Sequence, residues 1–244
     1  IADGWATSEQ IPGVRIPGAP FMGISAVSPS MAKLKEWADR EQRLIDKGGL
    51  AFPPDADGAI PGGACGLNGL RTIPPRENGG NFDVKQLTKG SKLILPVFTE
   101  GALFSTGDGH FAQGDGEVCV TAVEMGATAT VRFKLLKGLA ASRKFQAPVF
   151  THEDYFADPE VAVPRRFLGV MGMPITRDGD NEDENLTLAC KNAVLNMMEL
   201  LQERGFDREQ AYVICSVAAD LRIGNVVDVP NYVVTALLPE VIFG

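Results

Sequence analysis

The stretch from residue 107 to residue 117 restricts the possible folds of this chain more than any other. It reads Gly-Asp-Gly-His-Phe-Ala-Gln-Gly-Asp-Gly-Glu and contains four glycines, three acids and one of only two histidines in the sequence. Glycine allows the backbone to turn back tightly, and apolar segments flank the stretch on both sides. We therefore expect a hairpin-like return at one end of a β-sheet.

Two pairs of ligand-type side chains lie in this stretch. Asp108 and His110 are two residues apart, and so are Asp115 and Glu117. Residues at this spacing point to the same face of an extended strand, and a hairpin return would bring the two pairs together. Carboxylates beside an imidazole suit zinc or another divalent ion. An ordinary turn with a surface charge pair is the alternative.

Glu124 tests the geometry of the segment that follows. If residues 117–124 form one regular strand, Glu124 lies roughly 23 Å from Glu117, at about 3.3 Å per residue, and points to the opposite face. The two acids should then not share one metal ion. A bulge or a strong bend would remove this objection, so the strand geometry here decides the question.

Three separated motifs resemble the acetamidase/formamidase family of amide hydrolases. They are residues 107–117 followed by Ala-x-Glu-Met at 122–125, Arg-Thr-Ile-Pro-Pro-Arg-Glu-Asn-Gly-Gly-Asn-Phe-Asp at 71–83, and Val-Val-Asp-Val-Pro-Asn-Tyr-Val-Val at 226–234. The resemblance spans most of the chain. It implies a hydrolase that cleaves the C–N bond of a small amide to give a carboxylate and ammonia or an amine.

The resemblance also implies roles for particular residues. The expected ligands of a divalent metal, zinc or alternatively calcium, are Asp83, Asp108, His110 and Glu117. Glu124 or Asp115 would relay protons, and Asn81 would position the amide group. Two other functions stay open: a non-catalytic metal- or sugar-binding β-sandwich module, and an amidase that uses the Cys119 thiol as nucleophile.

The resemblance leaves the substrate open. Residues 17–27 read Pro-Gly-Ala-Pro-Phe-Met-Gly-Ile-Ser-Ala-Val and lack the His-Pro-Gly expected near this point. Formamide, acetamide and a cyclic amide such as a lactam therefore all remain candidates.

Composition narrows the class of protein. The 244 residues are 45% hydrophobic, enough for one large domain or two small ones. The net charge of -8 argues against a nucleic-acid surface, and no apolar run reaches the ~18 residues that span a bilayer. The four cysteines, with no CxxC pair, suggest buried thiols in a reducing cytoplasm. They are Cys65, Cys119, Cys190 and Cys215.

The pattern of elements predicts a mainly β protein, a jelly-roll-like β-sandwich with a smaller α+β portion that carries C-terminal helices. We expect the sandwich in residues 1–175, with an inserted helix at 31–47 that Ser30 caps. Residues 176–244 should form a helical hairpin and closing strands packed on this core. Its helices are expected at 186–204 and from a capping box at Asp207 and Gln210 to about residue 219.

The expected strands are short: brief ones lie within residues 1–29, a further one lies at 167–171, and a long surface loop precedes the others. The loop covers residues 50–70, and the strands are expected at 91–98, 103–105, 117–124, 128–136, 220–223 and 226–234. Asp220 is expected either to support the site or to pair with Arg222.

The first residues resemble an internal part of the family. Residues 1–15 match a region that other members precede with a further segment, so we expect a separate N-terminal segment of the same precursor to contribute to the core. We further expect a homo-oligomer in the cytoplasm that takes a small-molecule amide and binds neither nucleic acid nor membrane.

Overall fold

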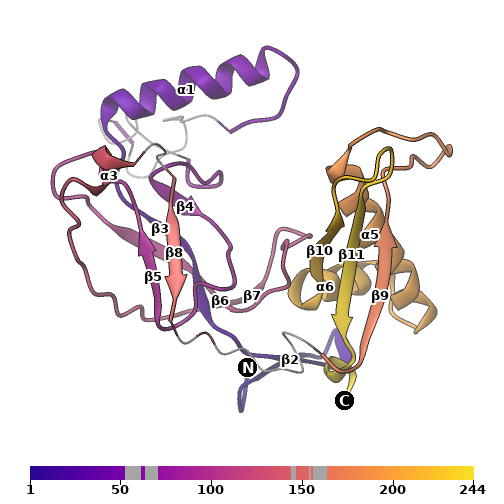
Figure 1. Cartoon of the computed structure of the whole chain (residues 1–244). Coiled ribbons are helices and arrows are strands. Elements are labelled where there is room, and N and C mark those ends of the chain that lie inside the picture. The colour runs from indigo at the N-terminus through magenta and orange to yellow at the C-terminus, as the bar shows by residue number, and fades with distance from the viewer. Residues whose placement is uncertain (53–61, 64–70, 144–146, 154, 156–163) are drawn as a thin grey trace.

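The computed structural model describes the whole chain except residues 53–61, 64–70, 144–146, 154 and 156–163 (Figure 1). The first elements are β1 (Trp5–Ser8), β2 (Ile11–Pro17), β3 (Phe21–Ala26), α1 (Met31–Ile45), β4 (Gly79–Asn81), β5 (Ser91–Ile94), β6 (Ser105–Ala112) and β7 (Val123–Met125). They are followed by α3 (Leu139–Ser142), β8 (Val149–His152), β9 (Phe167–Gly172), α5 (Leu186–Glu203), α6 (Arg208–Ala218), β10 (Asp220–Asn225), β11 (Val233–Pro239) and the 3-10 helix η1 (Glu240–Phe243).

All strand pairs in the described part of the chain are antiparallel, and they form four sheets. The largest has the order β4-β3-β6-β7, and a second has the order β10-β11-β9. Two further ladders join β1 to β2 and β5 to β8. The prediction of a mainly β protein with C-terminal helices is therefore confirmed.

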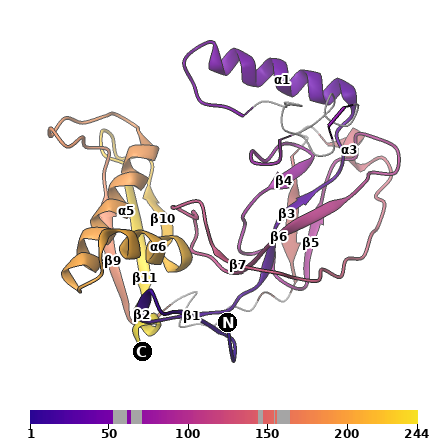
Figure 2. The ribbon, with the colours of Figure 1, turned by 180° about the vertical axis from the view of Figure 1, so that it is seen from behind.

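The elements gather into two halves that are visible from both sides in Figures 1 and 2. One half contains α1, the four-stranded sheet and the β5-β8 ladder, and the other contains the β10-β11-β9 sheet with α5 and α6. The chain around β2 connects the halves at their base, close to both termini. The segment before β7 lies higher and reaches β10, where the Leu221 amide donates to the Asp115 carbonyl oxygen.

One hydrophobic core joins β2, the buried end of β6 and the C-terminal helices. Val14 and Ile16 of β2 belong to the same buried cluster as Phe111 of β6 and the apolar face of α5 and α6. Gly172 at the end of β9 lets α5 approach closely, since a Cβ there would lie 2.1 Å from the Ala189 carbonyl oxygen.

The division of the chain into two parts at residue 175 stays a prediction.

The helix caps follow the sequence signals. The Ser30 side chain accepts a hydrogen bond from the Lys33 amide at the start of α1. Asp207 and Gln210 form the predicted capping box of α6, in which each side chain bonds the other residue's backbone amide. The expected helices are therefore present with nearly the expected bounds.

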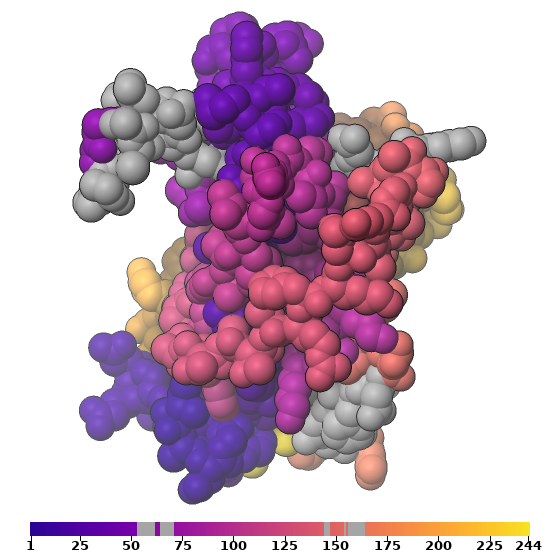
Figure 3. Space-filling view, turned by 90° about the vertical axis from the view of Figure 1, so that its left-hand side faces the viewer, coloured from indigo at the N-terminus to yellow at the C-terminus, as the bar shows by residue number. Residues whose placement is uncertain are grey.

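Several strands expected from the sequence are absent from the structure or shorter than expected, so these predictions are wrong. Residues 128–136 form no strand, and Val131 and Phe133 are exposed. In Figure 3 the rose-coloured part of the chain around these residues lies at the surface of the molecule. Within 117–124 only the last two residues belong to a strand, β7, and β11 begins only at Val233. β-branched and aromatic residues favour a strand, but without a partner strand or a core to cover no ladder forms. Most of the loop expected at 50–70 lies outside the described residues.

No helix in the described part of the chain combines the length and the apolar character needed to cross a membrane.

Candidate functional site

Strand β6 places Asp108 and His110 inside the four-stranded sheet. Its first residues are exposed and its last four are buried, so the strand runs from the surface into the core. His110 lies opposite Phe21 of β3 on one side and opposite Glu124 of β7 on the other. Its side chain is 1% exposed, and its ring meets the Phe21 ring edge-on at 5.1 Å.

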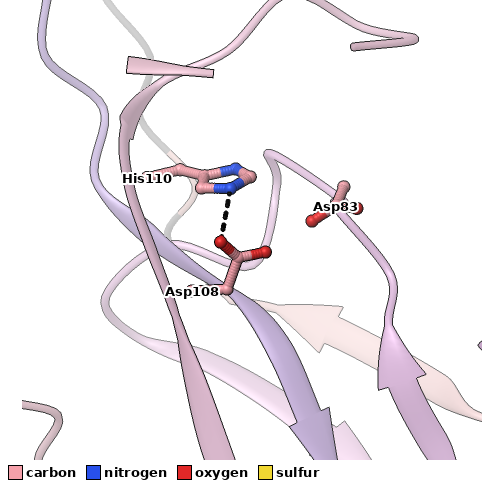
Figure 4. Close-up of side chains that lie close together, drawn as sticks. All are labelled: Asp83, Asp108 and His110. Atoms are coloured by element: carbon pink, nitrogen blue, oxygen red, sulfur yellow. Dashed lines mark ion pairs between the residues drawn. The ribbon is translucent and has the colours of Figure 1, made fainter. Parts of the chain in front are cut away.

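Carboxylates surround one nitrogen of this imidazole. His110 Nε2 lies 3.2 Å from Asp108 Oδ1, 3.4 Å from Glu124 Oε2 and 3.9 Å from Glu117 Oε1. Asp83 approaches from the segment after β4, and its ligand atom lies within 4.8 Å of those of Asp108 and His110 (Figure 4). His110, Glu117 and Glu124 meet the same distance limit. The two triads share His110 and form one acid-imidazole cluster.

Glu117 and Glu124 come together because the segment between them is not a regular strand. The register between β6 and β7 shifts between His110 and Ala112, and Glu117 and Val120 adopt positive φ angles of 40° and 64°. The regular strand that would place the two acids roughly 23 Å apart is therefore not formed, and a bend brings them together instead. The turns between them return the chain so that both carboxylates face one imidazole.

Three acids of the cluster hold unusual backbone conformations. The φ angles are 48° at Asp83, 59° at Asp108 and 40° at Glu117, all in the left-handed region. Aspartate tolerates this region better than most residues, whereas a glutamate there is uncommon. Such strain persists only where the surrounding structure enforces it, and it concentrates at functional sites.

Unpartnered atoms and one glycine show that the cluster fits a cation. His110 Nε2 and Asp83 Oδ1 are buried and lack a hydrogen-bond partner. Gly23 of β3 makes room for the acids, since a Cβ there would lie 2.5 Å from Asp83 Oδ1 and 2.7 Å from Asp108 Oδ2. Carboxylates gathered beside an imidazole nitrogen are a normal ligand set for a divalent ion.

The charges of the cluster change its proton affinities. Burial raises the pKa of Glu117 from 4.5 to about 7. The nearby charge of Asp83 contributes to this rise, whereas the charge of His110 opposes it. Burial likewise raises the pKa of Asp83. Burial lowers the pKa of His110, but the hydrogen bond to Gln113 and the charge of Glu124 outweigh it, so the pKa is raised overall. These carboxyl groups thus repel one another when no cation separates them.

Asn81, the expected amide-binding residue, lies next to the cluster. Its side-chain amide nitrogen donates to Asp83 Oδ2 at 2.7 Å. This bond occupies one of its donors and holds the Asp83 carboxylate, while the Asn81 carbonyl oxygen has no hydrogen bond to the cluster. The residue can therefore orient a ligand acid and still accept a bond from a substrate.

Asp115 does not join the cluster. It lies 3.7 Å from Lys85 Nζ, and its carboxylate accepts a hydrogen bond from Gln86. Asp220 takes part in the same network, because it pairs with Lys85, accepts from the Asp115 amide and lies 3.4 Å from Arg222. The expected pairing of Asp220 with Arg222 thus has a counterpart in the structure, whereas its support of the site stays a prediction. The network lines a cavity of about 220 Å³.

The other reactive side chains lie apart from the acid-imidazole cluster. The backbone amide of the half-buried Cys119 donates a hydrogen bond to the Ser216 hydroxyl. Cys119, Cys190 and Cys215 form no disulfide, and Cys65 lies outside the described residues. His152 Nε2 contacts the Lys89 carbonyl oxygen at 3.0 Å. Among the described residues, neither Cys119 nor His152 belongs to a group with metal-binding spacing.

Two site residues are absent from the predictions made on sequence. Gly23 carries no local signal, since its neighbours read as an ordinary strand. Gln113 lies within the central motif, three residues after His110, and its amide contacts the imidazole at 2.8 Å. Only its position in the motif could have indicated it.

Fold and site together define a class: a mainly β protein with a partly buried acid-imidazole cluster whose spacing suits a divalent cation. The chain belongs to the Acetamidase/Formamidase family, which matches it over residues 1–244. It is 37% identical to an acetamidase of Mycolicibacterium smegmatis over 85% of this chain and 54% of that protein. It is 33% identical to a formamidase of Methylophilus methylotrophus over 98% of this chain and 61% of that protein.

A solved structure shares the fold. The gamma lactamase from Delftia acidovorans superposes with a TM-score of 0.86 at 33% sequence identity, over 100% of this chain and 62% of the lactamase. The chain thus spans between half and two thirds of the length of these relatives.

Proposed function

We propose that this chain carries the metal-binding site of an amidase, which hydrolyses the C–N bond of a small amide with the help of a divalent ion. The observation that supports this most directly is the buried, unpartnered Nε2 of His110 among three carboxylates. Family membership and relatives named acetamidase, formamidase and gamma lactamase support the reaction class.

Asp83, Asp108, His110 and Glu117 would hold the ion. Zinc suits this set because it accepts an imidazole nitrogen together with carboxylate oxygens, whereas calcium prefers six to eight oxygens. When bound, such an ion supplies Lewis acidity toward an amide carbonyl and makes a nearby water molecule more acidic.

Glu124 is the candidate for proton transfer. Its side chain is 50% exposed, so it lies where the cluster meets solvent, and its Oε2 is close to the imidazole. In the net reaction, water adds to the carbonyl carbon, the C–N bond breaks, and the nitrogen leaves with an extra proton. Glu124 would accept the proton from water and donate it to the leaving nitrogen. Asp115, which pairs with Lys85 instead, has no part in this proposal.

Asn81 would orient the substrate. With its amide nitrogen bonded to Asp83, its carbonyl oxygen remains to accept a hydrogen bond from the N–H of the substrate amide. Primary amides and lactams both offer such an N–H. The names of the relatives therefore leave formamide, acetamide and a small lactam as the substrates to compare.

The direct test combines metal content with amide hydrolysis. Metal content is measured on the protein as purified, and release of ammonia or amine is followed with formamide, acetamide and γ-butyrolactam. We expect zinc in stoichiometric amount, activity on at least one of these amides, loss of activity after chelation and recovery on adding zinc. Full activity after exhaustive metal removal would disprove the proposed mechanism.

The same experiment separates the alternatives. A protein that binds metal tightly but hydrolyses no amide would be the non-catalytic module. An amidase that ignores chelators but is inactivated by thiol alkylation would act through Cys119. The cytoplasmic location and the homo-oligomer belong to the proposal as well. Size measurements on the intact protein test the oligomer.

A further inference from the structure

Gln113 connects two of the residues that the proposed function assigns to the metal. It follows β6 directly and is buried, with 7% of its surface exposed. One end of its side chain lies 2.8 Å from His110 Nδ1, and the other end lies 2.7 Å from the backbone carbonyl oxygen of Asp83. One amide group therefore bridges β6 and the segment after β4.

The chemistry of these partners fixes which way the amide points. A backbone carbonyl oxygen only accepts hydrogen bonds, so the Gln113 atom facing Asp83 must be the NH2 group. The atom facing the imidazole is then Oε1, which also only accepts. His110 Nδ1 must therefore carry a hydrogen and donate it to Gln113.

This hydrogen determines the tautomer of the ring. A neutral imidazole has one N–H, so when Nδ1 carries it, Nε2 presents a lone pair. Nε2 is the buried atom without a hydrogen-bond partner, 3.2 Å from Asp108 Oδ1. In the opposite tautomer Nε2 would donate to Asp108, and lone pairs of Nδ1 and Gln113 Oε1 would face each other.

We infer that Gln113 is a positioning residue: it holds His110 in the Nδ1–H tautomer, with Nε2 aimed at the acids, and fixes the backbone of Asp83 at the same time. The second bond matters because Asp83 has a left-handed φ of 48°, which must be held by its surroundings. The effect of Gln113 on zinc affinity rests on the proposed function. The tautomer of His110 does not, because it is measured in the metal-free protein.

The test reads the tautomer directly. The chain contains only two histidines, so ¹⁵N-histidine labelling gives two imidazoles, and His152→Gln assigns them. In the metal-free chain, at a pH where the His110 ring is neutral, we expect the hydrogen on Nδ1. A wild-type ring with its hydrogen on Nε2 would overturn the inference without any variant.

Two variants then separate positioning from a general structural effect. Gln113→Met keeps the length of the side chain but removes the amide, and we expect the Nε2–H tautomer to appear and zinc affinity to fall by about 10- to 100-fold. Gln113→Glu retains an acceptor for Nδ1–H, so we expect it to restore the tautomer. An unchanged tautomer and zinc affinity within about twofold in Gln113→Met would refute the role.

The outcomes for this inference and for the proposed function are distinct. A chain that shows the Nδ1–H tautomer but binds no zinc would contradict the proposed function and leave the role of Gln113 in orienting the ring intact. A Gln113→Glu protein with the hydrogen on Nε2 overturns the inference by itself, so the test does not depend on the folding of Gln113→Met.

Discussion

At the level of single residues, His110 is the one imidazole of the acid-imidazole cluster among the residues that the structure describes. His110→Gln removes the buried Nε2 to which the three carboxylates are close. We expect zinc affinity, measured by isothermal titration of the metal-free chain, to fall more than about a hundredfold, since the loss of a direct ligand exceeds that of a supporting partner. His152→Gln is the matched control. Equal losses in both variants would contradict the assignment.

Glu117 makes the metal-free protein sensitive to pH. Its pKa is raised from 4.5 to about 7, so the folded state keeps a proton that the unfolded state has released. The free energy of unfolding should therefore fall as the pH rises from about 4.5 to about 7. Metal affinity should rise over the same range, because protons and the cation compete for the carboxylate.

Glu117→Gln tests this linkage. Because the charge is absent, we expect the metal-free variant to be more stable than wild type by about 3 kcal/mol at pH 8 and equal to it at pH 4, while binding zinc more weakly. Urea unfolding at both pH values measures it. Glu36→Gln on the exposed face of α1 is the control. A variant that is less stable than wild type at pH 8 would contradict the charge repulsion.

At the level of elements, β3 contributes space rather than a ligand. Gly23→Ala would place a methyl group within 2.7 Å of carboxylate oxygens of both Asp83 and Asp108. We expect the sheet to form, because alanine is accommodated in a strand, but zinc affinity to fall by at least about tenfold. Gly107→Ala is the control in the adjacent strand β6, since its Cβ would meet nothing within 4 Å. Comparable zinc binding in both variants would show that the acids move aside.

At the level of the whole molecule, the Lys85–Asp220 ion pair connects the two halves. The two residues are 135 positions apart, and their side chains are 17% and 7% exposed. Removal of one partner leaves a charge with little access to water, so Lys85→Met should lower the free energy of unfolding by about 2 kcal/mol. Lys35→Met, which breaks an exposed pair on α1, should change it by less than about 0.5 kcal/mol.

A double-mutant cycle with Asp220→Asn completes this prediction. If the pair itself is responsible, the double variant should be more stable than the sum of the single effects predicts, by about 1 kcal/mol. Additive effects in urea unfolding would mean that Arg222 and the Asp115 amide satisfy Asp220 without Lys85.

Local sequence signals determined those features that depend on neighbouring residues. Ser30, Asp207 and Gln210 predicted the helix starts because a cap bonds backbone within the same turn. The motif from 107 to 117 supplied the ligand-type side chains, and Asp108 and His110 meet as their two-residue spacing predicts. Three of the residues proposed for the site, Asp108, His110 and Glu117, thus come from one segment.

The tertiary structure decided which of these side chains meet. Glu124 joins His110 across a strand pair and Asp115 turns away to Lys85, although both lie near the same motif. Gly23 matters only because β3 passes beneath two acids that are distant in sequence. Contacts of this kind depend on register, bulges and the path of other strands, and no local pattern encodes them. The sequence by itself determined the ligands on offer, and long-range packing determined the cluster that they form.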